Sequence, residues 1–185
     1  MVRLHITGAS GSGTTMLGRA LSKRLHISHL DTDDFFWFPI EPLFSRARLP
    51  EDRIKLLNEA FAKAGSWVLS GSIGHWGASL EQQFDLVIFL SVPTALRLSR
   101  LKAREIQRFG AKRLAPGGDR HESYKAFLDW AAGYENGSPQ QRSRVMHENQ
   151  LGKLPCPVLR FEGDRPLEAL VTESLAALRD HKLIP

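Results

Sequence analysis

The most constraining feature of the sequence is a glycine-rich loop between two patterned segments, in VRLHITGASGSGTTMLGRAL at residues 2–21. Residues 2–7 alternate in polarity and predict a strand, and residues 14–25 place leucines on one helical face. A loop between a strand and a helix directs backbone N–H groups and the positive end of the helix dipole toward one point, which favours a phosphate. We therefore expect a phosphate-binding loop formed by Gly8, Ser10, Gly11, Ser12, Gly13, Thr14 and Thr15.

This loop departs from the pattern G-x-x-x-x-G-K-[ST] at one position, because Thr14 stands where the pattern has lysine. A hydrogen bond to a charged group contributes about 1.5–3 kcal/mol, so another cation is expected to replace the lysine. A competing dinucleotide pattern, G-x-G-x-x-G, begins at Gly11 but reaches Met16 where its third glycine is required. The acid that this pattern needs about 20 residues later is present as Asp31 or Asp33, so a nicotinamide-dependent oxidoreductase is an alternative.

Strand-like and helix-like segments alternate along the rest of the chain. Strands are predicted at residues 28–34, 67–71, 84–90 and 157–163. Helices are predicted at 49–65, from 94 to near 110, and at 121–136, 139–152 and 166–181. Strands that are continuous apolar runs are expected in a sheet covered on both faces. The alternation predicts one parallel three-layer α/β domain spanning residues 1–185.

Composition narrows the class of protein. An apolar content of 42% is typical of a globular chain. No apolar run approaches the ~18 residues that a membrane span needs, and the N-terminal residues lack the pattern of a signal peptide. Cys156 is the single cysteine, which excludes an intramolecular disulfide and favours a reducing compartment. We expect a cytoplasmic protein with no membrane partner.

Positive charge is concentrated in RLSRLKAREIQRFGAKR, residues 97–113, where seven basic residues accompany one acid. Four arginines spaced by three, four and four positions form one stripe on a helix: Arg97, Arg100, Arg104 and Arg108. The helix follows a predicted strand directly, at the ligand-binding end of such a sheet. Arginine suits a phosphate because its planar fork donates two hydrogen bonds at once. A solvated basic face and a nucleic-acid surface are the alternatives.

Four segments occur in the order expected of adenylate-kinase-like small-molecule kinases: ITGASGSGTT, HLDTDDFFW, FDLVIFLSVPTALRLSRLKARE and VLRFEGDRPLEAL. The chain resembles this family over nearly its whole length and is similar to its topology-modulation-like branch, with shikimate and gluconate kinases as more distant relatives. The resemblance implies a three-layer P-loop NTPase fold with a five-stranded parallel sheet and a helical lid at about residues 105–145. It also implies ATP and Mg²⁺ as cofactors.

The same resemblance implies roles for individual residues. Arg100 and Arg104 match lid-edge arginines that clamp the transferring phosphoryl group, and Arg142 matches a further lid arginine. Gly163 and Asp164 lie in a segment that resembles the loop packing on the adenine ring.

The metal and the acceptor depend on acids after the second predicted strand. The third strand ends in LSGSIG and offers no acid, so the metal falls to Thr15 and, through water, to Asp31 or Asp33, with Asp31 the nearer candidate. By resemblance to shikimate-kinase-like enzymes, Asp33 is the candidate general base for an alcohol acceptor. A nucleotide acceptor would instead need arginines, which the next segment could supply as Arg46, Arg48 and Arg53.

Aromatic residues follow the same acids, in Phe35–Phe38. They are interpreted either as core packing or as a surface that stacks on a flat acceptor. Trp76 is expected to border the same cleft, and its neighbour His75 is left outside the catalytic set.

The sequence therefore predicts ATP-dependent phosphoryl transfer to a small-molecule acceptor, with no nucleic acid as partner. A nucleotide-binding module that has lost transfer is the alternative, and Thr14 is the residue that supports it.

Overall fold

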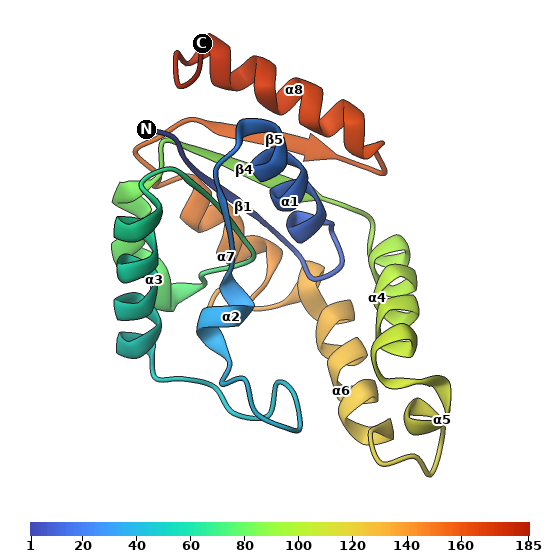
Figure 1. Cartoon of the computed structure of the whole chain (residues 1–185). Coiled ribbons are helices and arrows are strands. Elements are labelled where there is room, and N and C mark those ends of the chain that lie inside the picture. The colour runs from blue at the N-terminus through green and yellow to red at the C-terminus, as the bar shows by residue number, and fades with distance from the viewer.

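The computed structural model describes residues 1–185 and contains one five-stranded sheet in the order β2-β3-β1-β4-β5. Its strands are β1 (Arg3–Gly8), β2 (Ser28–Asp31), β3 (Trp67–Ser70), β4 (Leu86–Ser91) and β5 (Val158–Glu162). Every neighbouring pair is parallel, which confirms the predicted sheet. The carboxyl ends of all five strands therefore meet at one edge, where the glycine loop leaves β1 (Figure 1).

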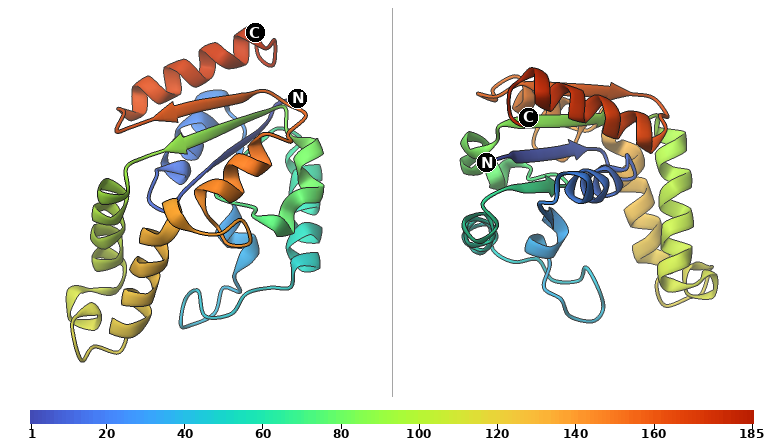
Figure 2. Two further views of the ribbon diagram at one scale, coloured as in Figure 1. Left: turned by 180° about the vertical axis from the view of Figure 1, so that it is seen from behind. Right: turned by 45° about the horizontal axis from the view of Figure 1, so that its top comes forward.

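Helices cover both faces of the sheet and make the predicted three layers (Figure 2). One face packs against α1 (Thr14–Leu25) and α8 (Leu167–Asp180), which contribute Leu17, Leu21 and Leu178 to the core. The other face packs against α3 (Pro50–Ala64), a 3-10 helix η1 (His75–Gln83) and α7 (Arg144–Leu151). β1, β3 and β4 are buried on both sides, which explains the apolar runs of β3 and β4.

A helical segment projects away from the carboxyl edge of the sheet (Figures 1 and 2). It consists of α4 (Thr94–Phe109), α5 (Ala111–Leu114), α6 (His121–Ala132) and a 3-10 turn η2 (Gly133–Asn136). We call residues 105–145 the lid segment, because this is the region that the sequence predicts as a lid. None of the helices in the structure combines the length and apolar character that crossing a bilayer requires.

Two predicted elements differ from the structure, and one observed element had no counterpart in the prediction. The strand predicted at residues 28–34 ends at Asp31, because the Asp31 carboxylate accepts from the backbone N–H of Asp33 at 3.1 Å and starts helix α2 (Thr32–Phe36). The helix predicted at 139–152 begins only at Arg144, where the Ser143 hydroxyl caps it by accepting from the Met146 N–H. The 3-10 helix η1 was not predicted.

Candidate functional site

The glycine loop has the backbone geometry of an anion-binding turn. Gly11 and Gly13 have φ values of +83° and +99°, which favour glycine. A Cβ atom on Gly11 would lie 2.7 Å from the Arg97 carbonyl oxygen, so no side chain fits there. Helix α1 begins directly after Gly13, which provides no side-chain cap. The first N–H groups of α1 therefore face the loop without a side-chain acceptor from the cap position, as a phosphate site requires.

Two buried side-chain groups in the whole structure lack a hydrogen-bond partner, and both belong to this region. They are the Ser12 hydroxyl, inside the loop, and Nε of Arg142, whose Nη2 donates to the Gly8 carbonyl at 2.8 Å. Buried polar groups in folded proteins are nearly always paired. Their concentration beside the loop fits a site that a polar ligand completes, and it supports the phosphate-binding prediction for Ser12.

The candidate metal ligands are brought together. The Thr15 hydroxyl donates to Oδ2 of Asp31 at 2.8 Å, and the Ser70 hydroxyl at the end of β3 lies 3.3 Å from the same oxygen. Nε2 of His29 lies 2.9 Å from the Ser70 hydroxyl and extends this chain of contacts. The structure holds no cluster of three or more His, Cys, Asp or Glu side chains suited to a metal. Mg²⁺ keeps several waters and needs few protein ligands, so Thr15 and Asp31 fit it.

A positively charged side chain lies beside the glycine loop, in which Thr14 replaces the expected lysine. Arg142 reaches the Gly8 carbonyl from the segment before α7 and lines the cavity next to the loop. Burial lowers the pKa of the Arg142 guanidinium, while the nearby Asp33 carboxylate opposes that shift. Arg142 is therefore the candidate for the cation that replaces the missing lysine.

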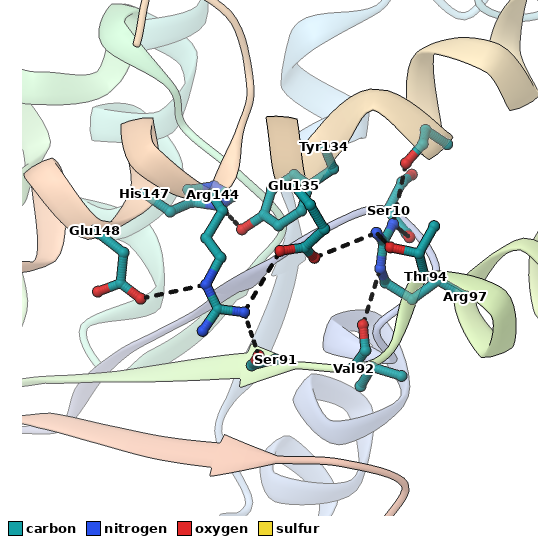
Figure 3. Close-up of polar contacts among 11 residues, drawn as sticks. Ser10, Ser91, Val92, Thr94, Arg97, Tyr134, Glu135, Arg144, His147 and Glu148 are labelled. Atoms are coloured by element: carbon teal, nitrogen blue, oxygen red, sulfur yellow. Dashed lines mark hydrogen bonds and ion pairs between the residues drawn. The ribbon is translucent and has the colours of Figure 1, made fainter. Parts of the chain in front are cut away.

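Arg97 is a correction to the predicted anion-binding stripe, because its side chain is completely buried. Its guanidinium donates to four acceptors and also faces Glu135 at 3.7 Å (Figure 3). The acceptors are the carbonyls of Val92, Ser10 and Ala131 and the Thr94 hydroxyl, at 2.9–3.3 Å. Arg97 therefore connects the glycine loop with the start of α4 and the end of α6. Its guanidinium is not free to bind a ligand.

The other predicted arginines of the stripe separate into two groups. Arg104 and Arg108 line the cavity beside the loop, where both contact Glu105, at 3.2 and 3.5 Å. Arg100 instead pairs with Asp164 at 2.6 Å, in the turn after β5 where Gly163 has a φ of +80°. The structure thus brings together Arg100 and the predicted adenine loop.

A polar network behind the loop was missed by sequence reasoning. Arg144 contacts Glu135 and Glu148, which continue the contacts of Arg97 toward α7 (Figure 3). Nδ1 of His147 lies 2.7 Å from the Tyr134 hydroxyl, and burial lowers the pKa of His147 to about 3. Only the i,i+4 spacing of Arg144 and Glu148 is visible in the sequence, because the other contacts depend on the fold.

The main cavity encloses about 570 Å³ next to the glycine loop, within the usual range for small-ligand sites of ~300–1,000 Å³. Ser10, Asp33, Arg104 and Arg142 all line it. Asp33 remains exposed to solvent, but desolvation at the cavity wall and the neighbouring Asp31 charge raise its pKa, while the arginines of the cavity oppose this. Asp33 thus lies near Arg142 and on the wall of the space that an acceptor would occupy.

The three arginines predicted for a nucleotide acceptor are held elsewhere, with Arg46 and Arg48 before α3 and Arg53 within it. The Arg46 guanidinium lies 4.6 Å from the centroid of the Phe38 ring, and that of Arg53 lies 3.6 Å from the centroid of the Phe36 ring. Arg48 donates to the backbone carbonyls of Asp34, Phe35 and Trp37. None of the three lines the cavity.

The predicted aromatic surface is also divided. Phe36 and Trp37 line the cavity, whereas Phe35 packs on the core around α3. Trp76 packs against Phe36 and does not line the cavity, and Nε2 of His75 lies 2.8 Å from the Pro139 carbonyl. The expectation that Trp76 borders the acceptor cleft is therefore wrong, because η1 directs it toward α2 and α3.

Comparison with known proteins defines the class. Residues 5–114 match the family described as AAA domain, and the chain belongs to that family. This match includes the whole glycine loop and all of α4 and α5. Arg142 and the turn at Gly163 and Asp164 lie beyond the matched residues.

A protein of Bacillus subtilis (strain 168), described as uncharacterized protein YqaC, is 47% identical over 161 residues, which cover 87% of this chain and 88% of that protein. Two solved structures are similar in fold. Shikimate kinase from Acinetobacter baumannii, in complex with shikimate, has a TM-score of 0.59 at 16% identity. The match covers 100% of this chain and 96% of the shikimate kinase chain. Shikimate kinase from Bacteroides thetaiotaomicron has a TM-score of 0.58 at 19% identity, with 96% and 98% covered. The fold is therefore the predicted three-layer α/β P-loop NTPase fold.

Proposed function

We propose that this protein transfers the terminal phosphoryl group of ATP, bound with Mg²⁺, to a small-molecule acceptor. The observation that carries the proposal is the position of the glycine loop beside a large cavity that contains Asp33, Arg104 and Arg142. The kinase-like fold supports the same reaction type. Membership of the topology-modulation-like branch and a cytoplasmic location accompany this proposal as predictions.

Each group has a defined task in the proposed reaction. The loop N–H groups and the Ser12 hydroxyl bind donor phosphates, and Thr15 and Asp31 hold Mg²⁺, which neutralises phosphate charge when bound. Arg104 and Arg142 stabilise charge near the transferring group, in place of the missing lysine. Asp33 accepts a proton from an acceptor hydroxyl, for which a raised pKa is suited.

The donor base has a separate candidate site. Arg100 and Asp164 form an ion pair next to Gly163, away from the cavity lining. In the proposal this pair borders the adenine ring, and Arg100 contributes to donor binding more than to the clamp on the transferring phosphoryl group. This placement refines the role that the sequence resemblance implies for Arg100.

The second candidate is a nucleotide-binding module that does not catalyse transfer. It is favoured by Thr14 and by the hydrogen bond that already engages Arg142 with the Gly8 carbonyl. A nicotinamide-dependent enzyme has less support, because β1 here neighbours β3 rather than β2, unlike the 3-2-1-4-5-6 order of the dinucleotide-binding fold.

Release of ADP tests the proposal directly. The wild-type protein is mixed with Mg-ATP and a panel of hydroxylated acids, nucleosides and nucleoside monophosphates. Thr14→Lys is compared with Met16→Lys, which adds the same charge at a position whose side chain is 64% exposed. Acceptor-dependent turnover by the wild type supports the kinase. Turnover that appears only with Thr14→Lys supports the binding module.

A further inference from the structure

The residues that line the main cavity indicate which class of acceptor it binds. This inference rests on the proposed function. Figure 1 shows α2 and the segment that follows it on one side and the lid segment on the other. Residues of both sides line the cavity, so an occupant that fills it contacts both. Its chemistry is therefore a guide to the class of molecule that binds there.

Aromatic rings line both sides of the cavity. One side carries Phe36, Trp37 and Phe44, and the lid segment carries Phe109, Phe127 and Trp130. The rings of Phe127 and Trp130 are nearly parallel, with 28° between their planes and 6.0 Å between centroids. Trp130 is 45% exposed although it is a large apolar side chain. Aromatic rings on both walls of a cavity, with Trp130 partly exposed, favour a flat ring as the occupant.

The cavity also has an excess of positive charge. Four arginines line it against two acids, Asp33 and Glu105, and Glu105 is already shared between Arg104 and Arg108. Arg120 and Arg142 have no carboxylate within 4.0 Å. Arg120 lies 4.1 Å from the centroid of the Phe109 ring and Arg142 lies 5.7 Å from that of Trp130. Arginines that lie on aromatic faces without a direct ion pair favour an anionic ligand.

The polar groups are divided between the two ends of the cavity. Ser10, Asp33 and Arg142 mark the end at the glycine loop, because Ser10 belongs to the loop and Arg142 bonds its Gly8 carbonyl. Arg120 stands just before α6, at the end of the lid segment far from the sheet (Figure 1). An acceptor whose hydroxyl faces Asp33 can therefore place an anionic group near Arg120.

We propose that the acceptor is a flat aromatic ring that carries a hydroxyl group at one end and an anionic group at the other. Phosphoryl transfer to it breaks the bond between the terminal phosphorus of ATP and its bridging oxygen and forms a bond to the acceptor oxygen. The hydroxyl proton passes to Asp33, and ADP is the leaving group. The aromatic walls select a planar ring, and Arg120 selects the charge.

Matched probes separate these requirements. A small probe with all three features is para-(hydroxymethyl)benzoate, whose hydroxyl is an alcohol. The corresponding amide lacks the charge, and trans-4-(hydroxymethyl)cyclohexanecarboxylate lacks the planar ring. In para-(hydroxymethyl)phenyl phosphate, a phosphate replaces the carboxylate. Binding is followed by the change in tryptophan fluorescence, because Trp37 and Trp130 line the cavity.

One of the two aromatic anions should bind about tenfold more tightly than the amide and the cyclohexane acid, the effect of one charged hydrogen bond or cation–π contact. Arg120→Gln should remove the preference for the anion over the amide. Arg113→Gln should leave it unchanged, because Arg113 pairs with Asp119 on the exposed side of the lid segment. Equal binding of all four probes, or equal effects of the two variants, overturns the inference.

The unfolding midpoint with Mg-ATP is measured on the same samples. If Mg-ATP binds and the aromatic anions show no preference, the acceptor inference fails and the kinase proposal stands. If Mg-ATP does not bind, the proposed function fails, whatever the probes show.

Discussion

Replacing Arg97 by methionine should destabilise the protein more than any surface change. The guanidinium is fully buried and donates to the carbonyls of Val92, Ser10 and Ala131 and to the Thr94 hydroxyl. A hydrogen bond to a charged group contributes about 1.5–3 kcal/mol, but neighbouring losses are not additive. Removing one partner of a buried charged cluster typically costs about 3–5 kcal/mol, and this is the loss that we expect.

The loss is measured by urea unfolding, and the midpoint of thermal unfolding should fall by about 2–4 °C per kcal/mol for a chain of this size. Arg24→Met is the control, because Arg24 forms an exposed pair with Glu168 at 3.4 Å and such pairs contribute about 0–1 kcal/mol. Arg97→Lys should recover only part of the loss, because one ammonium group cannot reach carbonyls on several sides. Similar destabilisation by Arg97→Met and Arg24→Met would refute the reasoning.

Three further results are expected. Asp33→Asn should abolish acceptor phosphorylation while Mg-ATP still shifts the unfolding midpoint, since the loop contacts are retained; loss of both would contradict a role confined to the acceptor. Gly11→Ala should weaken Mg-ATP binding measured by calorimetry, because φ is +83° and the new Cβ would lie 2.7 Å from the Arg97 carbonyl oxygen; unchanged affinity would exclude the loop. Burial lowers the pKa of His5 to about 4 and that of His147 to about 3. Below the unfolded pKa of ~6.5, the unfolded chain therefore binds more protons than the folded protein. The free energy of unfolding should fall by roughly 2 kcal/mol per histidine as the pH falls from 6.5 to 5. Urea unfolding of a variant with both histidines changed to glutamine should show a shallower decline over that range, and an equal slope would contradict the assignment.

Local patterns predicted most of the fold. The strand, loop and helix at residues 2–25 and the alternation of later segments have signals within a few residues of one another. Helix α3 begins at Pro50 and ends before Gly65, as the sequence indicates. The end of β2 was harder to predict, because it depends on a single cap by Asp31.

The site was predictable where the chain itself sets the contacts. Thr15 and Asp31 meet because Thr15 lies in the first turn of α1, after the loop that leaves β1, and Asp31 is the last residue of β2. The roles of the arginines on α4 were not predictable from their spacing. Regular spacing places them on one side of the helix but does not show which of them is buried. Arg97 is buried where three segments converge, and Arg120 faces the cavity only because the lid segment folds back.

The central claim is that the glycine loop binds Mg-ATP although Thr14 replaces its lysine. The most direct measurement is thermal unfolding of the wild type, Thr15→Val and Thr172→Val with and without Mg-ATP. Thr172 is exposed on α8, so its variant is a matched control. At 100 times the dissociation constant, binding stabilises by about 2.7 kcal/mol, which predicts a shift of about 5–11 °C for the wild type and the control. The shift should be much smaller for Thr15→Val, whereas no wild-type shift, or equal shifts in all three proteins, would contradict the account.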